Sequence, residues 1–409
     1  MTTMRFLQIT SDKVKNQTIL WLCGMHFCWG MASSMIFSLL PVFIVDELGG
    51  NSKSFGALEG AVIFFSFMAK LFAGFIMDIF KRKLPMFNTG TILTIFSKLS
   101  LACAPSVFFV FISKSLDRFA KGLRQAPSDT ILAEISEKKG FAYSLRYTSN
   151  ISGFLSGSII TSTIVAMLGK NFRLIFSLAV LPAVIAIYIL RTKIKYDDTK
   201  KYELKEKQKW SVKDIKNMPH AYWKFIILIS FLMFNRFSEG FITLRAKDVI
   251  PEHIGSFPLF MGLYELCAIS IAVLIGRISD KIDKRKILLL GICLLIIADL
   301  FGVFTNSTVA TVCIYVFAGL HMGTTQGIIG AIIAKLAPSR LTGSAFAIFY
   351  GIEGLVLLLS NNLAGFSADV AKAYSISGSC APFICGGMFS VLSITYICFW
   401  IRKEKNSTI

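Results

Sequence analysis

The sequence predicts an all-α polytopic membrane protein with twelve transmembrane helices, arranged as two six-helix bundles related by pseudo-two-fold symmetry. Three observations lead to this prediction. Long apolar runs recur along all 409 residues, a short charged turn occurs twice, and cationic residues gather in alternate loops. The mean hydropathy is +0.65 and 54% of the residues are hydrophobic, whereas soluble domains hold roughly half apolar residues or fewer. The composition therefore indicates that the bilayer is the solvent.

The twelve spans follow from length. A helix needs about 20 apolar residues to cross the roughly 30 Å of hydrocarbon in a bilayer. We expect no cleavable signal peptide, because the apolar run after Lys15 continues past Pro41 and is too long for the core of one. The predicted spans lie near 19–45, 55–79, 84–103, 106–127, 141–166, 172–190, 221–247, 257–279, 286–305, 309–335, 342–366 and 381–401.

The placement of charge predicts the orientation. A net charge of +19 would suggest a nucleic-acid partner in a soluble protein. Here the basic residues concentrate at both termini and in alternate loops, which the positive-inside rule assigns to the cytoplasm. We therefore expect cytoplasmic termini, a lipid bilayer as the surroundings, and no nucleic-acid partner.

A repeated turn indicates an internal duplication. Gly74-Phe-Ile-Met-Asp78 leads to the basic run 81–83, and Gly276-Arg-Ile-Ser-Asp280 leads to the basic run 284–286. The two glycines are 202 positions apart, about half the chain. A second, weaker echo precedes predicted spans five and eleven, at residues 140 and 343. Duplicated halves with a substrate site at their interface are typical of secondary transporters.

The duplication gives the domain division. Residues 1–190 are expected to form the N-terminal six-helix bundle and residues 218–409 the C-terminal one. Between them, residues 191–217 are the only long polar segment and carry ten Lys and Arg residues against five acids. We expect a cytoplasmic basic linker, either a solvated connector or one with a surface helix on anionic lipid.

The repeated turn resembles the hallmark of the major facilitator superfamily, G-x-x-x-D-x-x-G-R/K-R/K after spans two and eight. Both copies match at the Gly, the Asp and the trailing cations, and both depart at the inner Gly, where Lys81 and Asp283 stand. Residues 117–127 and 239–246 are also similar to a poorly characterised bacterial branch. The resemblance implies the fold of that superfamily, location in a bacterial cytoplasmic (inner) membrane, and spans one, four, seven and ten around a cavity.

The sequence lacks the machinery of other classes. No G-x-x-x-x-G-K-S/T loop is present, which argues against an ATP-driven pump. The four His and nine Cys show no spacing for a metal or a nucleophile, so we expect no enzyme activity, no metal and no cofactor. A membrane receptor or membrane enzyme is thus the less favoured class.

Predicted span four carries the densest intramembrane charge. Lys114, Asp117, Arg118 and Lys121 stand at i, i+3, i+4 and i+7, on one helix face. Such charges are costly in a bilayer, so they are functional candidates by default. We expect Arg118, Lys114 and Lys121 to attract an anionic substrate. The alternative is structural: the stripe locks span four to its neighbours while Lys121 and Arg124 extend to the cytoplasmic surface.

Predicted span seven adds Arg236 and Glu239 near its middle. The resemblance implies that Arg118 and Arg236 face the cavity from opposite halves, where two guanidiniums suit bidentate capture of a carboxylate or phosphate. Pairing of Arg236 with Glu239 is the alternative.

Proton coupling needs a carboxylate or an imidazole. Glu353 is the first choice, because it lies between Gly351 and Gly354 with only apolar neighbours in the sequence. The further candidates are Glu239, Asp117 and His321.

A last group is expected to gate the transporter. Gly153 and Gly157 form a G-x-x-x-G pair that lets a helix approach closely, and the resemblance suggests span eight as its partner. Asp78, Asp280 and Arg277 of the repeated turn are expected to latch the cytoplasmic side.

The sequence thus predicts a secondary active transporter, expected to be a monomer, that moves a small organic solute by alternating access. The cationic excess favours an anionic or zwitterionic metabolite, and a proton is the expected coupling ion. Multidrug or siderophore efflux by the same fold is the alternative.

Overall fold

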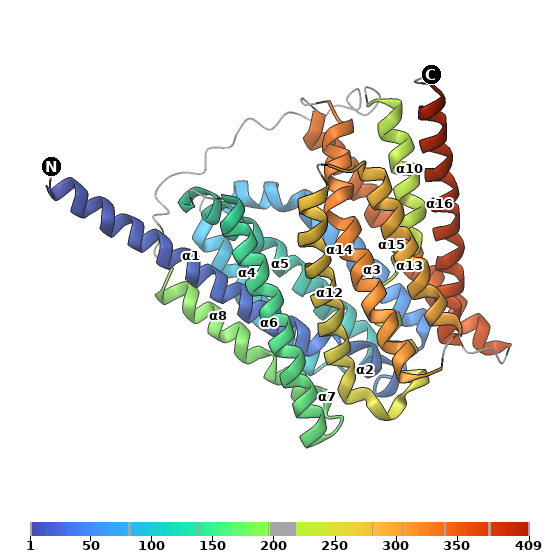
Figure 1. Cartoon of the computed structure of the whole chain (residues 1–409). Coiled ribbons are helices and arrows are strands. Elements are labelled where there is room, and N and C mark those ends of the chain that lie inside the picture. The colour runs from blue at the N-terminus through green and yellow to red at the C-terminus, as the bar shows by residue number, and fades with distance from the viewer. Residues whose placement is uncertain are drawn as a thin grey trace. The chain divides into compact units, whose positions relative to one another are not determined.

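The structure is a computed structural model. It describes residues 2–80, 83–136, 139–194, 196, 218–279, 281–304, 306–338, 341–374 and 378–407. Within these ranges the side chains of 2–15, 68–80, 126, 133, 139–141, 143, 342–344 and 401–407 are not described. The described residues form helices joined by short connections, without a strand (Figure 1). Most of the predicted linker 191–217 lies outside the described residues.

The contacts divide the chain into two compact units. Unit 1 comprises Met1–Leu39 and Met68–Lys207, and unit 2 comprises Leu40–Phe67 and Gln208–Ile409. The contacts group Leu40–Phe67 with the later helices, so the two units differ from the two predicted bundles, residues 1–190 and 218–409. The predicted division therefore stays a prediction.

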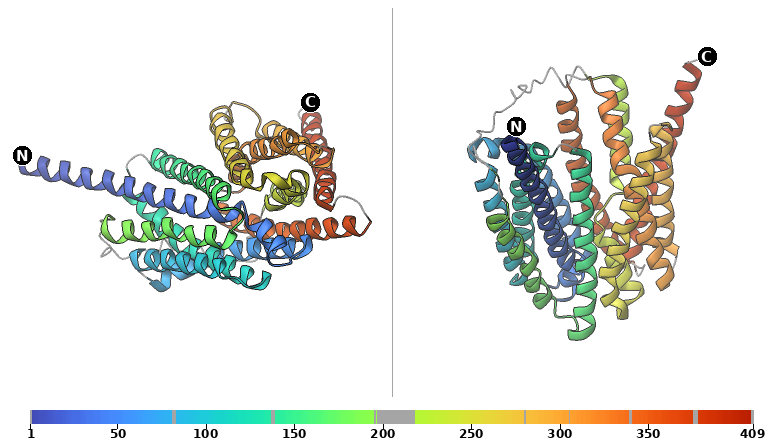
Figure 2. Two further views of the ribbon diagram at one scale, coloured as in Figure 1. Left: turned by 90° about the horizontal axis from the view of Figure 1, so that it is seen from below. Right: turned by 60° about the vertical axis from the view of Figure 1, so that its left-hand side comes forward.

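Unit 1 is built around two helix pairs. Helix α1 packs along α6 and α8, and α4 packs along α5 and against α7 and α8 (Figures 1 and 2). The helices of this unit are α1 (Thr2–Phe37), the end of α3 (Ser52–Phe80), α4 (Lys83–Ala102), α5 (Val107–Ile135), α6 (Lys139–Leu168), α7 (Phe172–Leu178) and α8 (Val180–Thr192).

The G-x-x-x-G pair of α6 serves the contact with α1. A Cβ on Gly153 would lie 1.9 Å from the carbonyl oxygen of Phe27, and one on Gly157 would lie 2.5 Å from that of Met31. Only glycine lets the two backbones come this close. The expectation that these glycines meet span eight is therefore wrong: their partner is span one, within unit 1.

In unit 2, helix α14 packs against α12 and α13, and α16 packs against α13, α10 and α15. Two short 3₁₀ helices, Pro251–Ser256 and Gly378–Cys380, lie between the longer ones. The helices are α2 (Leu40–Asp46), the start of α3, α10 (His220–Phe234), α11 (Gly240–Val249), α12 (Phe257–Ile278), α13 (Lys284–Phe304), α14 (Thr308–Leu336), α15 (Thr342–Ala373) and α16 (Ala381–Ser407).

Close backbone packing holds the start of α3 in unit 2. A Cβ on Gly56 would lie 2.2 Å from the carbonyl oxygen of Asn361, so α3 and α15 meet at glycine. At the same end, Lys247 pairs with Asp46. These contacts explain why a segment that precedes residue 190 belongs to the later unit.

Each predicted span coincides with a helix or with two consecutive helices. Within the described residues, eight segments are long and apolar enough to cross a membrane. Among the four others, α5 carries several intramembrane charges, and the seventh predicted span is interrupted between α10 and α11. The all-helical fold is confirmed, and eight crossings are supported by length and composition.

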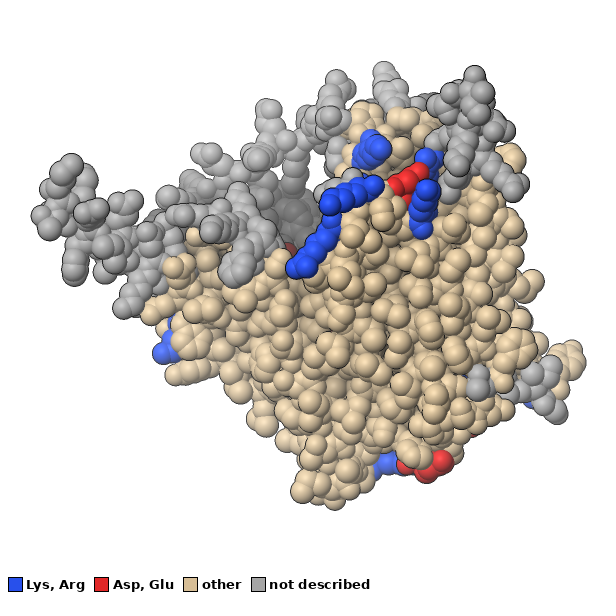
Figure 3. Space-filling model, viewed as in Figure 1, with Lys and Arg blue, Asp and Glu red and all other residues tan. Residues whose placement is uncertain are grey.

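The surface agrees with a lipid environment. Figure 3 shows a broad uncharged expanse with charged side chains gathered near the helix ends. Large apolar side chains are exposed along α12 and α16, including Val273, Leu274, Met388 and Phe399. A soluble protein rarely exposes so much apolar surface, so these faces are suited to acyl chains.

Candidate functional site

Unit 2 contains a cavity of about 220 Å³ at the interruption of the seventh predicted span. Helix α10 ends at Phe234 and α11 begins at Gly240, and Asn235, Ser238 and Gly240 are weak helix formers. Irregular backbone is tolerated at membrane depth where it is buried in protein or lines a cavity. The polar and charged residues that line the cavity are Asn235, Arg236, Ser238, Glu239, Tyr264, Asp299, His321, Gln326 and Glu353.

Helix α15 satisfies the interrupted backbone. The Ser360 hydroxyl donates to the carbonyl oxygen of Phe234 at 2.8 Å, and the backbone N–H of Ser238 donates to the Asn361 side-chain oxygen at 2.8 Å. These two bonds fix the segment that carries Arg236 and Glu239.

Arg236 is held by neutral side chains of α14. Its Nε donates to His321 Nε2 at 3.1 Å, its Nη2 donates to the Thr325 hydroxyl, and its Nη1 lies 3.4 Å from the Gln326 oxygen. No carboxylate among the described residues comes within ion-pair distance of Arg236. The predicted alternative, pairing with Glu239, is therefore absent. The guanidinium is oriented but keeps its charge.

His321 has both ring nitrogens occupied. Nδ1 lies 2.8 Å from the carbonyl oxygen of Gly291, which can only accept, and Nε2 faces the Nε–H of Arg236, which can only donate. The neutral ring with the proton on Nδ1 satisfies both partners. A protonated ring would set an N–H against the guanidinium, so this geometry favours a positioning role over the predicted proton relay.

The two glutamates of the cavity differ in their surroundings. Glu239 accepts a hydrogen bond from the Tyr264 hydroxyl at 3.1 Å. Glu353 of α15 lines the same cavity as Arg236. Glu353 is the first choice as proton carrier because its sequence neighbours are apolar, and the structure adds a cation to the cavity that it lines.

Asp299 is a cavity residue that sequence reasoning passed over. It lies on α13, is 4% exposed, and its carboxylate accepts from Asn235 Nδ2 at 2.6 Å. A signal existed in the sequence, since an acid thirteen residues after Lys286 within an apolar run is itself an intramembrane charge.

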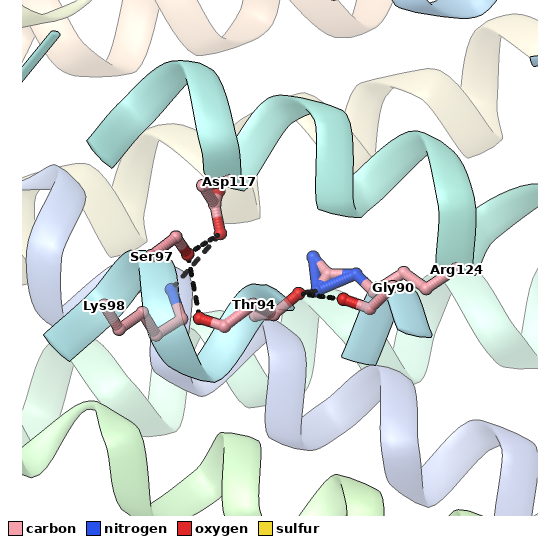
Figure 4. Close-up of polar contacts among 6 residues, drawn as sticks. All are labelled: Gly90, Thr94, Ser97, Lys98, Asp117 and Arg124. Carbon is pink, nitrogen blue, oxygen red and sulfur yellow. Dashed lines mark hydrogen bonds and ion pairs between the residues drawn. The ribbon is translucent and has the colours of Figure 1, made fainter. Parts of the chain in front are cut away.

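Unit 1 holds a second charged cluster, between α4 and α5 (Figure 4). Asp117 lies 3.9 Å from Lys98 Nζ and accepts a hydrogen bond from the Ser97 hydroxyl at 3.3 Å. Its ion-pair partner thus comes from α4, not from its own helix face. α4 and α5 also carry Lys83, which pairs with Glu134, and Asp129, which pairs with Arg146 of α6. The remaining charged residues of these two helices are Asp117 and five cations: Lys98, Lys114, Arg118, Lys121 and Arg124.

The cations of α5 have different surroundings. Lys114 is buried and Lys121 is exposed, whereas Arg118 is half-buried and forms no hydrogen bond or ion pair with the described residues. Arg124 is buried: its Nη1 donates to Thr94 at 2.9 Å and its guanidinium lies 4.6 Å from the Trp29 ring centre. The expectation that Arg124 extends to the cytoplasmic surface is wrong.

The predicted gating residues are only partly described. Asp280 lies outside the described residues, as does the side chain of Asp78, and Arg277 is exposed in the last turn of α12. Beside them, Asp283 caps α13: its carboxylate accepts from the backbone N–H of Arg285 at 2.9 Å and pairs with the Arg285 guanidinium. A carboxylate cap therefore stands where the resembled motif has a glycine.

Comparisons with known proteins agree with this architecture. The family model described as Major Facilitator Superfamily matches residues 22–361 and 246–408. An uncharacterized MFS-type transporter of Methanocaldococcus jannaschii is 23% identical over 395 residues, covering 94% of each chain. A multi-drug resistance efflux pump PmrA homolog of Lactococcus lactis is 20% identical over 348 residues, covering 81% of this chain and 85% of the relative.

Among solved structures, a mutant of the nucleoside transporter NupG superposes with a TM-score of 0.78 at 13% identity. The match covers 93% of this chain and 99% of that one. This likeness concerns the fold, and the family match spans most of the sequence. The chain belongs to the major facilitator superfamily of membrane transporters.

Proposed function

We propose that this protein is a secondary active transporter that moves a small anionic or zwitterionic organic solute by alternating access, driven by protons. The observation that carries the proposal is Arg236. It lines a cavity in unit 2, neutral side chains hold it in place, and no described carboxylate pairs with it. A half-buried cation arranged in this way is suited to bind an acidic group.

The charge balance of the two units refines the substrate class. Outside the ion pairs Lys83–Glu134 and Arg146–Asp129, α4 and α5 of unit 1 carry five cations and one carboxylate, which favours an acidic group. The unit 2 cavity sets Arg236 beside three carboxylates, Glu239, Asp299 and Glu353, which also suits a cationic group. The proposed substrate class therefore includes zwitterionic as well as anionic solutes.

Uptake into proteoliposomes tests the proposal. Purified protein is reconstituted with an imposed pH gradient and screened against carboxylated, phosphorylated, zwitterionic and lipophilic cationic solutes. Arg236→Gln and Arg118→Gln should abolish uptake of the solute found. Arg285→Gln is the matched control, because Arg285 lies in the first turn of α13, outside the cavity lining, and pairs with Asp283. Equal behaviour of all three variants would contradict the assignment.

Efflux of lipophilic compounds is the second candidate. It is favoured by the relative named as a multi-drug efflux pump and by the aromatic side chains of Phe237, Tyr264 and Phe383 in the cavity lining. Competition separates the two candidates: a lipophilic cation that blocks binding better than an organic anion does would favour efflux, and the reverse order would favour the leading proposal.

We also propose that the chain acts as a monomer in a cytoplasmic membrane, with both termini in the cytoplasm. The basic residues of the termini and of the linker support this orientation.

A further inference from the structure

Asp299 is a buried carboxylate for which the described part of the chain offers no cationic partner. Its described partner is one neutral amide, Asn235 Nδ2 at 2.6 Å, and no Lys, Arg or His of the described residues lies within ion-pair distance. An ionised carboxylate can accept about four hydrogen bonds, and burying its charge with one donor is costly. The protonated form is thus the low-cost state whenever water leaves the cavity.

The groups on the neighbouring helices also provide no cation that pairs with Asp299 among the described residues. From α14, both ring nitrogens of His321 are already engaged, with the Gly291 carbonyl and with Arg236. The membrane part of α16, residues 381–400, carries no Asp, Glu, Lys or Arg. The other charged residues that line the cavity are Arg236, Glu239 and Glu353. Arg245 of α11 is bonded to the carbonyl oxygen of Gly302, which follows Asp299 by three residues on α13.

Asn235 can respond to the proton on Asp299. Its Nδ2 donates both to Asp299 and to the Ser390 hydroxyl at 2.7 Å, while its Oδ1 is buried without a partner. This orientation suits an ionised carboxylate. Rotation of the amide by half a turn brings the oxygen to the same position, where it accepts from a protonated Asp299 and from Ser390.

The same amide lies in the interrupted backbone. Asn235 caps the end of α10 and directly precedes Arg236, and a Cβ on Gly386 would lie 1.8 Å from Asn235 Oδ1. α16 therefore leaves the amide little room. A change in its hydrogen bonds acts on the segment that carries Arg236 and Glu239.

We propose that Asp299 is a proton-binding site of this transporter and that Asn235 transmits its protonation to the α10–α11 interruption. The inference rests on the proposed proton-coupled transport. It assigns the coupling to Asp299 in preference to Glu353, Glu239, Asp117 and His321. Glu239 accepts a hydrogen bond from the Tyr264 phenol, whereas Asp299 faces an amide alone among the described residues.

Infrared difference spectroscopy tests the site without a known substrate. The full-length protein in lipid is titrated through the neutral pH range while the carboxylic acid C=O band is followed. We expect a band from a buried protonated carboxyl that is lost in Asp299→Asn and kept in Glu353→Gln. A band that persists in Asp299→Asn, or that is lost only in Glu353→Gln, would overturn the inference.

Transport measurements then separate this inference from the proposed function. With a solute identified by the screen, Asp299→Asn should lose accumulation driven by the pH gradient but keep solute exchange at equal pH. If Asp299→Asn does not fold, Asp299→Glu should fold with the pH midpoint of its carboxyl band displaced, and an unchanged midpoint would count against the site. If Asp299→Asn accumulates solute at the rate of the unmodified protein, or if transport depends on sodium and not on pH, the assignment of Asp299 as the proton-binding site is refuted. If the unmodified protein transports nothing, the proposed function is refuted instead.

Discussion

Arg236 is a half-buried cation whose orientation could not be predicted from its own helix, because its hydrogen-bond partners come from α14. His321 and Thr325 lie one helical turn apart on that helix and reach the same guanidinium. Holding a charge with neutral donors and acceptors keeps it available, since no carboxylate neutralises it.

His321 provides the first test at this scale. His321→Phe removes the acceptor for Arg236 Nε, and a hydrogen bond to a charged group contributes about 1.5–3 kcal/mol. We expect the Kd of the transported solute to rise by roughly tenfold or more, as measured by scintillation proximity binding. His321→Gln offers an acceptor oxygen and should recover part of the affinity. Loss of pH-gradient drive with unchanged affinity would instead make His321 a proton carrier.

Arg124 provides a contrasting case in unit 1. Because it bonds Thr94 and stacks over Trp29, we expect Arg124→Gln to lower the free energy of unfolding by about 1.5–3 kcal/mol. Thermal unfolding followed by size-exclusion chromatography measures the loss. Solute affinity should change little. If Arg124→Gln instead keeps full stability but does not bind solute, Arg124 would have to be assigned to the substrate site.

At the scale of elements, the α1–α6 contact depends on glycine. A Cβ on Gly153 would lie 1.9 Å from the Phe27 carbonyl oxygen, so Gly153→Ala must separate the two helices. We expect a destabilisation of about 1–3 kcal/mol or more, seen as a lower thermal midpoint in detergent.

Gly24 is the matched control for this change. It lies on α1 with nothing within 4 Å of an added Cβ, so Gly24→Ala should be neutral or stabilise by up to about 1 kcal/mol. If both variants lose the same stability, the close approach at Gly153 is not the cause.

The cap of α13 predicts a pH dependence. The hydrogen bond from Arg285 holds the pKa of Asp283 below its ordinary value of 3.8. A lowered carboxyl pKa stabilises the fold above that ordinary value, and the contribution is lost as the pH falls further. Asp283→Ala should cost about 1 kcal/mol at neutral pH, as for other caps. Unfolding of both proteins at neutral and acidic pH tests this, and the difference should shrink in acid.

At the scale of the whole molecule, orientation is the property that charge placement predicts. Single cysteines are introduced into a cysteine-free background as Lys170→Cys and Lys205→Cys. Lys170 lies in the short connection between α6 and α7, and Lys205 belongs to the predicted linker. An impermeant thiol reagent applied to intact cells should label position 170, and position 205 only after lysis. The opposite pattern would invert the proposed topology.

The sequence by itself determined the membrane class, the positions of the helices and the family, because apolar length and the repeated turn are local properties of the chain. It also singled out Arg236, Glu239 and Glu353, since a charge within an apolar run is visible without coordinates. These three residues line one cavity in unit 2.

Only the tertiary structure decided which groups meet. It gave Asp117 a partner on α4, buried Arg124, set Gly153 against α1, and drew attention to Asp299. The physical reason is that helix periodicity determines which residues share a face of one helix, whereas hydrogen bonds and ion pairs between helices depend on how segments that are distant in the sequence pack together. A residue such as Asp299 acquires its proposed role from Asn235, sixty-four positions away.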